Sequence, residues 1–257
     1  VVAAALRRGM SVDCGLHDFL SDDPELVALA ASHGGELRDV RRTPPRGELH
    51  GFTGRILEVA APRIAVLGTD SAVGKRTTAW RLVDSLVARG FSAEMIRTGQ
   101  TGWLQGARYG MLLDATINDF VAGELEHACL SAWDEARPDY MVVEGQGSLL
   151  NPAYPGGLEI LAATRASTIV LQHAPARLEY DGFPGFPIEP VERQIAALEL
   201  VSPARVVAIT VNHEHLDDAA LAAACEDLRA RTGLPVADPL RHGVEEIVDA
   251  VLAHTRA

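Results

Sequence analysis

The chain has 257 residues, 47% of them hydrophobic, and a formal net charge of −12 at pH 7. This length is enough for one large or two modest domains with ample cores. The acidic balance argues against a nucleic-acid partner, because contact with phosphate backbones needs a basic face. No apolar run approaches the roughly 20 residues that cross a bilayer, so we expect no membrane partner. Three isolated cysteines fit a reducing compartment, and we expect a cytoplasmic protein.

Residues 1–40 alternate between helix and strand patterns. We expect a helix through Arg8, then a strand at 10–14, a helix at 24–33 and a strand at 36–40. This order indicates the last βαβ portion of a Rossmann-like layer. Because the first strands of that layer and an initiating Met are both missing, we expect a piece of a longer polypeptide. No Gly-x-Gly-x-x-Gly motif occurs, so the pattern does not predict dinucleotide binding.

Residues 41–55 form the clearest boundary in the chain. The segment contains four arginines and several Pro and Gly residues, has few apolar residues and shows no sustained period. Such a composition is typical of a linker or an exposed loop between domains. We therefore expect a partial Rossmann-like domain with its linker at 1–55 and a second α/β domain at 56–257.

The second domain again alternates strands and helices. Strands are expected at 64–67, 92–97, 140–144, 167–172 and 205–211 and near Val236. Helices are expected at 76–88, 115–132, 190–201, 218–231 and 244–253. Alternation of this kind favours a mostly parallel sheet that helices cover on both faces.

Residues 64–78 show the clearest functional motif. Four apolar residues, a Gly-rich turn and an amphipathic helix follow one another, which is the arrangement of a phosphate-binding P-loop. Glycines allow backbone N–H groups to approach a phosphate, the helix N-terminus adds a positive dipole, and a lysine adds a point charge. The predicted fold is therefore P-loop NTPase-like. The candidates for cofactor binding are Gly68, Thr69, Gly74, Lys75, Arg76 and Thr77.

The motif departs from the regular P-loop in two ways. Gly68 and Gly74 enclose five residues in place of four, and Arg76 stands where a hydroxyl normally ligates Mg²⁺. A guanidinium group cannot coordinate a cation, but it can hold phosphate oxygens with two parallel hydrogen bonds. No metal site is predicted with certainty. If the ligand is ATP with Mg²⁺, Thr77 and Glu144 are the metal candidates.

Polar residues follow the expected strands where ligands usually lie in such sheets, at the carboxyl ends. Glu144 ends an apolar strand and is followed by Gly-Gln-Gly, so we predict a catalytic base or a metal-orienting acid there. His173 is a second candidate base, although a histidine that only stabilises its loop is about as frequent. Asp70 in the P-loop is the third catalytic candidate.

The P-loop residues Gly68-Thr69-Asp70 and Val73-Gly74-Lys75 resemble the loop of dethiobiotin synthetase. This resemblance implies that Asn212 reads an adenine, that Asp238 closes the other side of the adenine, and that Glu144 matches a Mg²⁺-directing acid. A closer resemblance covers nearly the whole chain. The segments 68–75, 98–102, 144–148 and 151–154 are similar to a bacterial family that was long without a function, and some of its members are described as D-glutamate N-acetyltransferases.

Three functions follow from these residues and resemblances. The first is acetyl transfer from acetyl-CoA to the amine of a small acidic amino acid, as the family resemblance implies. The second is ATP- and Mg²⁺-dependent carboxylate activation or phosphorylation of the dethiobiotin synthetase type. The third is nucleotide binding without turnover, in a regulator. We expect a homo-oligomer. The candidates for substrate binding are Gln100, Thr101, Gln146, Ser148, Arg108 and Arg177, with the linker arginines as further candidates for a carboxylate.

Overall fold

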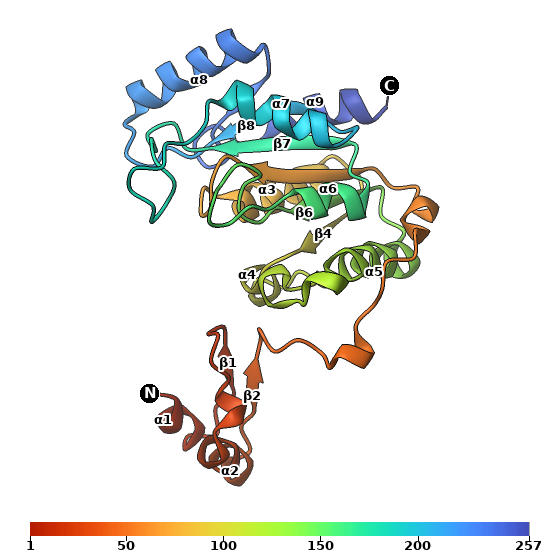
Figure 1. The fold of residues 1–257 in the computed structure, drawn as a ribbon, viewed down its shortest axis with the longest axis vertical. Helices are drawn as coiled ribbons and strands as arrows, with labels where there is room; N and C mark the ends of the chain where they lie inside the picture. Colours follow the sequence, from red (N-terminus) through yellow and green to blue (C-terminus); the bar gives the residue numbers. More distant parts are fainter. Residues whose placement is uncertain (257) are drawn as a thin grey trace.

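The computed structural model describes residues 1–256 and contains two sheets, each built of parallel strands (Figure 1). The small sheet pairs β1 (Val12–Cys14) with β2 (Leu37–Asp39), beside α1 (Val2–Leu6) and α2 (Pro24–His33). The large sheet has the order β5-β4-β6-β3-β7-β8-β9. Its strands are β3 (Arg63–Gly68), β4 (Ala93–Arg97), β5 (Tyr109–Gly110), β6 (Tyr140–Glu144), β7 (Thr168–His173), β8 (Arg205–Val211) and β9 (Val236–Ala237).

Helices cover both faces of the large sheet. One face packs on α3 (Lys75–Ala88) and α9 (Glu245–Thr255), and the other on α5 (Asn118–Ala136), α6 (Leu158–Thr164), α7 (Val191–Val201) and α8 (Asp218–Thr232). Alternate residues of a strand point to opposite faces of the sheet. Ile64 and Val66 therefore lie in the core beneath α3 and α9, whereas Ala65 and Leu67 lie in the core on the other face. This double burial explains why β3 is a continuous apolar run.

The predicted fold class is confirmed, and each strand expected from the sequence is present with bounds shifted by at most two residues. The sequence did not predict β5, α4 (Gln100–Leu104) or α6. These three elements have two, five and seven residues, which is too short for a clear period. The division of the chain at residue 55 stays a prediction.

The small sheet contacts the large one through the ends of its strands. Nε of Arg41 donates to the carbonyl oxygen of Gly15 at 2.8 Å, and the Arg41 guanidinium also pairs with Asp114. Gly15 lies directly against Gln100 of α4, because a Cβ at Gly15 would be only 1.9 Å from Oε1 of Gln100. The loop after β1 therefore lies against the start of α4, and Figure 1 shows the small sheet on the α4 side of the large one.

A buried carboxylate fastens the linker to α5. Glu126 is 1% exposed and accepts hydrogen bonds from the backbone N–H of Thr53 at 2.6 Å, the Thr53 hydroxyl at 2.8 Å and the N–H of Ile56 at 3.0 Å. Burial raises the pKa of Glu126, but these hydrogen bonds outweigh it and leave the pKa below its ordinary value. Glu126 is therefore ionised at neutral pH.

We predict that Glu126→Ala lowers the free energy of unfolding by about 2–4 kcal/mol at neutral pH, because two backbone donors lose their acceptor. A group with a lowered pKa stabilises the fold above its unfolded pKa, and the effect is lost as the pH falls through the folded pKa. The difference in unfolding free energy between the wild type and the variant should therefore become smaller when the pH falls below 4.5, the ordinary carboxyl pKa. Urea unfolding at several pH values measures it. Asp134→Ala, at an exposed position of the same helix, is the control, and an equal loss in both variants would contradict the prediction.

Candidate functional site

The P-loop joins β3 to α3 and borders a cavity of about 420 Å³, which we call the P-loop cavity. Its lining consists of residues 71–77 and 144–147. Gly74 has a φ of 111°, which an L side chain rarely adopts, and a Cβ at Gly145 would be 2.2 Å from the carbonyl oxygen of Val66. Both glycines are therefore required for the close backbone approach that a phosphate site needs.

Two cationic side chains line the P-loop cavity. Lys75 is 7% exposed, and its Nζ donates to the carbonyl oxygens of Asp70 at 2.6 Å and Gly147 at 2.8 Å. Burial lowers the pKa of Lys75 to about 8, although Asp70 and Glu144 oppose the shift. Arg76 has a buried Nε that finds no hydrogen-bond partner among residues 1–256. The cavity therefore offers positive charge that an anion could satisfy.

The Asp70 carboxylate is fully buried and does not face the P-loop cavity. It accepts hydrogen bonds from Nδ2 of Asn151, Nη1 of Arg177 and the backbone N–H of Asp181, each at 2.9 Å, and from the N–H of Ser71 at 2.7 Å. It thereby joins the loops after β3, β6 and β7. The oxygens of Asp70 are thus engaged in holding these loops, and its predicted catalytic role stays a prediction.

Glu144 does line the P-loop cavity, at the end of β6. It is 4% exposed, and its Oε2 accepts the backbone N–H groups of Thr98 at 3.0 Å and Gly99 at 3.2 Å. Burial raises the pKa of Glu144 above the ordinary carboxyl value, although these hydrogen bonds and the charges of Arg76 and Lys75 oppose the shift. A carboxylate with a raised pKa in the wall of a cavity is suited to accept a proton.

His173 lies on the opposite side of β3 from Glu144 and is not part of the cavity lining. Its Nδ1 is 2.9 Å from the Thr69 hydroxyl, and burial lowers its pKa to about 4, so the ring is neutral at neutral pH. The structure favours the loop-stabilising role for His173. The sequence analysis missed its neighbour Gln172, which is 2% exposed and accepts the hydroxyls of Thr78 and Thr210 beneath the P-loop.

The predicted adenine residues line a small cavity of about 110 Å³ next to the P-loop. Nδ2 of Asn212 donates to the Val73 carbonyl at 3.1 Å, and Asp238 is 2.6 Å from Nδ1 of His213. Asp238 also accepts the backbone N–H of Leu240 at 2.8 Å. The side chains of Asn212 and Asp238 thus already form hydrogen bonds within the chain, and their roles in cofactor binding stay predictions.

Four of the predicted substrate residues surround the turn between β4 and α4 or the loop after β6. Gln146 lines the P-loop cavity, and Gln100 and Thr101 begin α4. Oε1 of Gln100 and Oγ of Ser148 are buried, and neither has a hydrogen-bond partner within residues 1–256. Unsatisfied buried polar atoms are uncommon, but neither Gln100 nor Ser148 lines the P-loop cavity or the cavity at the β4–β5 edge of the sheet, so their roles in substrate binding stay predictions.

The two arginines predicted to meet the substrate already have partners. Arg108 is exposed, pairs with Glu135 and packs over the ring of Tyr109. Arg177 donates to Asp70 and, at 2.7 Å, to Glu214. Neither lines the P-loop cavity. Both side chains therefore form ion pairs away from the P-loop cavity, and their predicted substrate contacts stay predictions.

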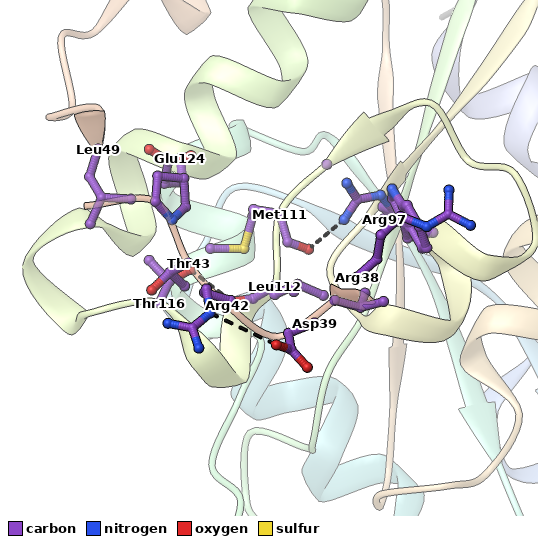
Figure 2. A pocket seen from close by; sticks show the side chains of 14 residues that line it. Arg38, Asp39, Arg42, Thr43, Leu49, Arg97, Met111, Leu112, Thr116 and Glu124 are labelled. Atoms are coloured by element: carbon purple, nitrogen blue, oxygen red, sulfur yellow. Dashed lines mark hydrogen bonds and ion pairs between the residues drawn. The ribbon is translucent and has the colours of Figure 1, made fainter. Parts of the chain in front are cut away.

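A second cavity, of about 410 Å³, lies between the linker and the β4–β5 edge of the sheet (Figure 2). Its lining includes Arg38, Arg42 and Arg97, and we call it the arginine cavity. Arg42 belongs to the linker whose arginines were predicted as carboxylate ligands. The sequence analysis missed Arg97, although its position directly before Thr98, at the end of a strand, was a usable signal.

The structure also bears on metals and membranes. Among residues 1–256, three or more His, Cys, Asp or Glu side chains nowhere gather in a way that could hold a metal ion. In the same part of the chain, no helix has the length and apolar character needed to cross a membrane.

A glycine-rich loop that joins a central parallel strand to a helix and carries a lysine at the helix start defines a P-loop protein. Residues 50–248 match the P-loop domain of the DUF1611 family, which is described as a domain of unknown function. Residues 1–43 match the Rossmann-like N-terminal domain of the same family. The chain belongs to the DUF1611 family.

Three relatives illustrate the similarity. A protein from Tritonibacter scottomollicae named D-glutamate N-acetyltransferase is 34% identical over 259 residues, which cover 98% of this chain and 75% of the relative. A Pseudoalteromonas protein of the same name is 34% identical over 255 residues, covering 96% and 74%. The crystal structure of a DUF1611 protein from Anabaena variabilis superposes with a TM-score of 0.90 at 33% identity, covering 98% of this chain and 74% of the other.

We predict that Asp70 and Arg177 are energetically coupled. Asp70→Ala should cost about 3 kcal/mol of unfolding free energy, because it leaves a largely buried guanidinium without its partner. In the Asp70→Ala, Arg177→Ala double variant the loss should be smaller than the sum of the two single losses by more than about 1 kcal/mol. Urea unfolding of all four proteins gives the coupling, and strictly additive losses would refute it.

Proposed function

We propose that this protein transfers the acetyl group of acetyl-CoA to the amine of a small acidic amino acid such as D-glutamate. Two relatives at 34% identity have the name D-glutamate N-acetyltransferase, and each match covers nearly all of this chain. The P-loop cavity supplies positive charge for the phosphates of CoA, and Glu144 in its wall supplies a base.

The observation that favours acetyl-CoA over ATP is the position of Arg76. Its guanidinium replaces the hydroxyl that would ligate Mg²⁺, and its Nε is buried without a partner among the described residues. Phosphoryl transfer depends on metal ions to neutralise charge at the γ-phosphate. The phosphates of CoA only anchor the molecule, so a fixed guanidinium is sufficient to hold them.

The residues of the P-loop cavity fit the phosphates of acetyl-CoA. The backbone at 71–77 would surround them, with Lys75 and Arg76 as the charged contacts. In the wall of this cavity, Gly74 has a φ of 111°, and Gly145 has no room for a Cβ, which would lie 2.2 Å from the carbonyl oxygen of Val66. When bound, acetyl-CoA supplies a thioester, which is an activated acyl group.

Glu144 has the properties needed to prepare the amine for acyl transfer. Its raised pKa lets it accept a proton from the substrate ammonium group, which leaves a neutral, nucleophilic amine. The amine forms the new amide bond as the carbon–sulfur bond breaks, and the departing thiolate takes up a proton. The N–H groups of Thr98 and Gly99 keep the carboxylate in place.

An ATP- and Mg²⁺-dependent ligase or kinase is the second candidate. Thr77 favours it, because this residue lines both the P-loop cavity and the neighbouring small cavity and carries a hydroxyl. The two candidates differ in their need for a metal ion and a nucleoside triphosphate.

Mass analysis of D-glutamate incubated with acetyl-CoA and EDTA tests the proposal. We expect N-acetylglutamate to form without ATP and without added metal. A matched reaction with ATP and Mg²⁺ in place of acetyl-CoA should give no product and no ADP. Product or ADP in the second reaction alone would replace acetyl transfer with the ligase or kinase function.

We predict that Glu144→Gln lowers kcat by about 10²- to 10⁴-fold, since the amide cannot accept a proton. The dissociation constant of acetyl-CoA should change little, because the base acts mainly in the reacting complex. In the wild type, kcat should fall as the pH drops through the raised pKa of Glu144, where the carboxyl is protonated. Steady-state kinetics and calorimetry provide both readouts. Unchanged turnover in the variant would give Glu144 a structural role.

We predict that CoA affinity weakens as the pH rises above about 8, where Lys75 loses its charge. Lys75→Arg should remove this pH dependence, because a guanidinium stays charged. Calorimetric titration of CoA across this range compares the two proteins. Affinities that decline in parallel would show that another group titrates.

A further inference from the structure

The arginine cavity combines positive charge with apolar surface. Arg38 comes from β2, Arg42 from the linker and Arg97 from the end of β4 (Figure 2). Met111 and Leu112 supply apolar wall between them. A cavity of about 410 Å³ is in the size range of sites for small molecules. Its chemistry suits a short carbon chain that ends in a carboxylate.

Two carboxylates also line the arginine cavity, but both already have partners. Asp39 accepts the backbone N–H groups of Leu20 at 2.8 Å and Ser21 at 2.9 Å. Glu124 accepts the backbone N–H of His50 at 2.7 Å. Three guanidinium groups thus line the cavity together with two carboxylates, and Asp39 also lies 4.0 Å from Nε of Arg42.

Arg97 differs from the other two arginines of the cavity. Within residues 1–256 it forms no ion pair, and its hydrogen bond is from Nη1 to the Met111 carbonyl at 3.3 Å. Its Nε is buried without a partner, and burial lowers the pKa of Arg97. The charge of Glu144 opposes this shift, but Nε still has no partner among the described residues, and an anionic ligand at the half-buried guanidinium would supply one. The other two arginines each pair with an aspartate, Arg38 with Asp13 and Arg42 with Asp22.

Arg97 and Glu144 lie on either side of Gly102. A Cβ at Gly102 would be 2.8 Å from Cβ of Arg97 and 3.1 Å from Oε2 of Glu144. From this point the Arg97 side chain extends to Met111, in the wall of the arginine cavity. We assume that an amine bound at Glu144 keeps the α-carboxylate beside it, so that the far end of the molecule is the part that extends past Gly102 toward the guanidinium.

We propose that the arginine cavity binds the side-chain carboxylate of the acidic amino acid and that Arg97 is the residue that selects for it. This inference rests on the proposed function, because it places the reacting amine at Glu144. The Arg97 guanidinium donates two parallel hydrogen bonds to the carboxylate, while Met111 and Leu112 cover the methylene groups.

The test compares D-glutamate with D-glutamine, which lacks the side-chain charge. In Arg97→Met, the ratio of kcat/KM for D-glutamate to that for D-glutamine should fall by about 10- to 100-fold, through the KM for D-glutamate. Acetyl-CoA binding should be unchanged. Arg97→Lys keeps the charge but not the planar geometry, so its ratio should be intermediate. Arg193→Met removes the same charge from an exposed position of α7 and should leave the ratio unchanged.

An unchanged ratio in a folded Arg97→Met protein would overturn the inference and leave the proposed function intact. An equal loss with both substrates would also overturn it, because a merely structural role affects both. If the wild type acetylates neither substrate, the proposed function fails. Calorimetric titration with D-glutamate alone then tests the arginine cavity by itself. A dissociation constant at least about tenfold higher in Arg97→Met than in the wild type supports the cavity. Equal dissociation constants, or no binding to the wild type, refute the role of Arg97.

Discussion

The buried carboxylate of Asp70 determines how the loops of the site are held. Hydrogen bonds from Asn151, Arg177 and Asp181 reach it from the loops that follow β6 and β7, and Ser71 donates from the P-loop itself. Glycine gives the P-loop its freedom, but glycine alone does not select one conformation. The ion pair with Arg177 supplies that selection, because each partner would be costly to bury alone. The conformation of the P-loop thus depends on residues far away in the sequence.

Charge is distributed over two cavities that share no lining residue, one at the P-loop and one at the end of β4. The P-loop cavity has Lys75 and Arg76, and the arginine cavity has Arg97, which forms no ion pair within residues 1–256. The turn that contains Gly102 lies between them, and its backbone also holds the Glu144 carboxylate. A base between one site for phosphates and another for a carboxylate is a suitable arrangement for joining an anionic acyl donor to an anionic amino acid.

Much of the fold could be predicted because its signals are local. Apolar runs such as Ile64–Leu67 identify strands buried on both faces, and the P-loop glycines with Lys75 have chemistry that is readable from neighbouring residues. The partners of charged side chains were not predictable in this way. Arg177 pairs with a residue 107 positions away and Arg108 with one 27 positions away, so neither engagement leaves a local pattern. Arg97 stood out only once the linker was placed against β4.

A crystal structure with CoA and N-acetyl-D-glutamate tests the central claim most directly, because it locates both ligands in one molecule. The account predicts CoA phosphates against residues 71–76 and the side-chain carboxylate of the amino acid on the Arg97 guanidinium, with the acylated nitrogen next to Glu144. CoA bound outside the P-loop cavity, or an amino acid whose nitrogen lies away from Glu144, would contradict it.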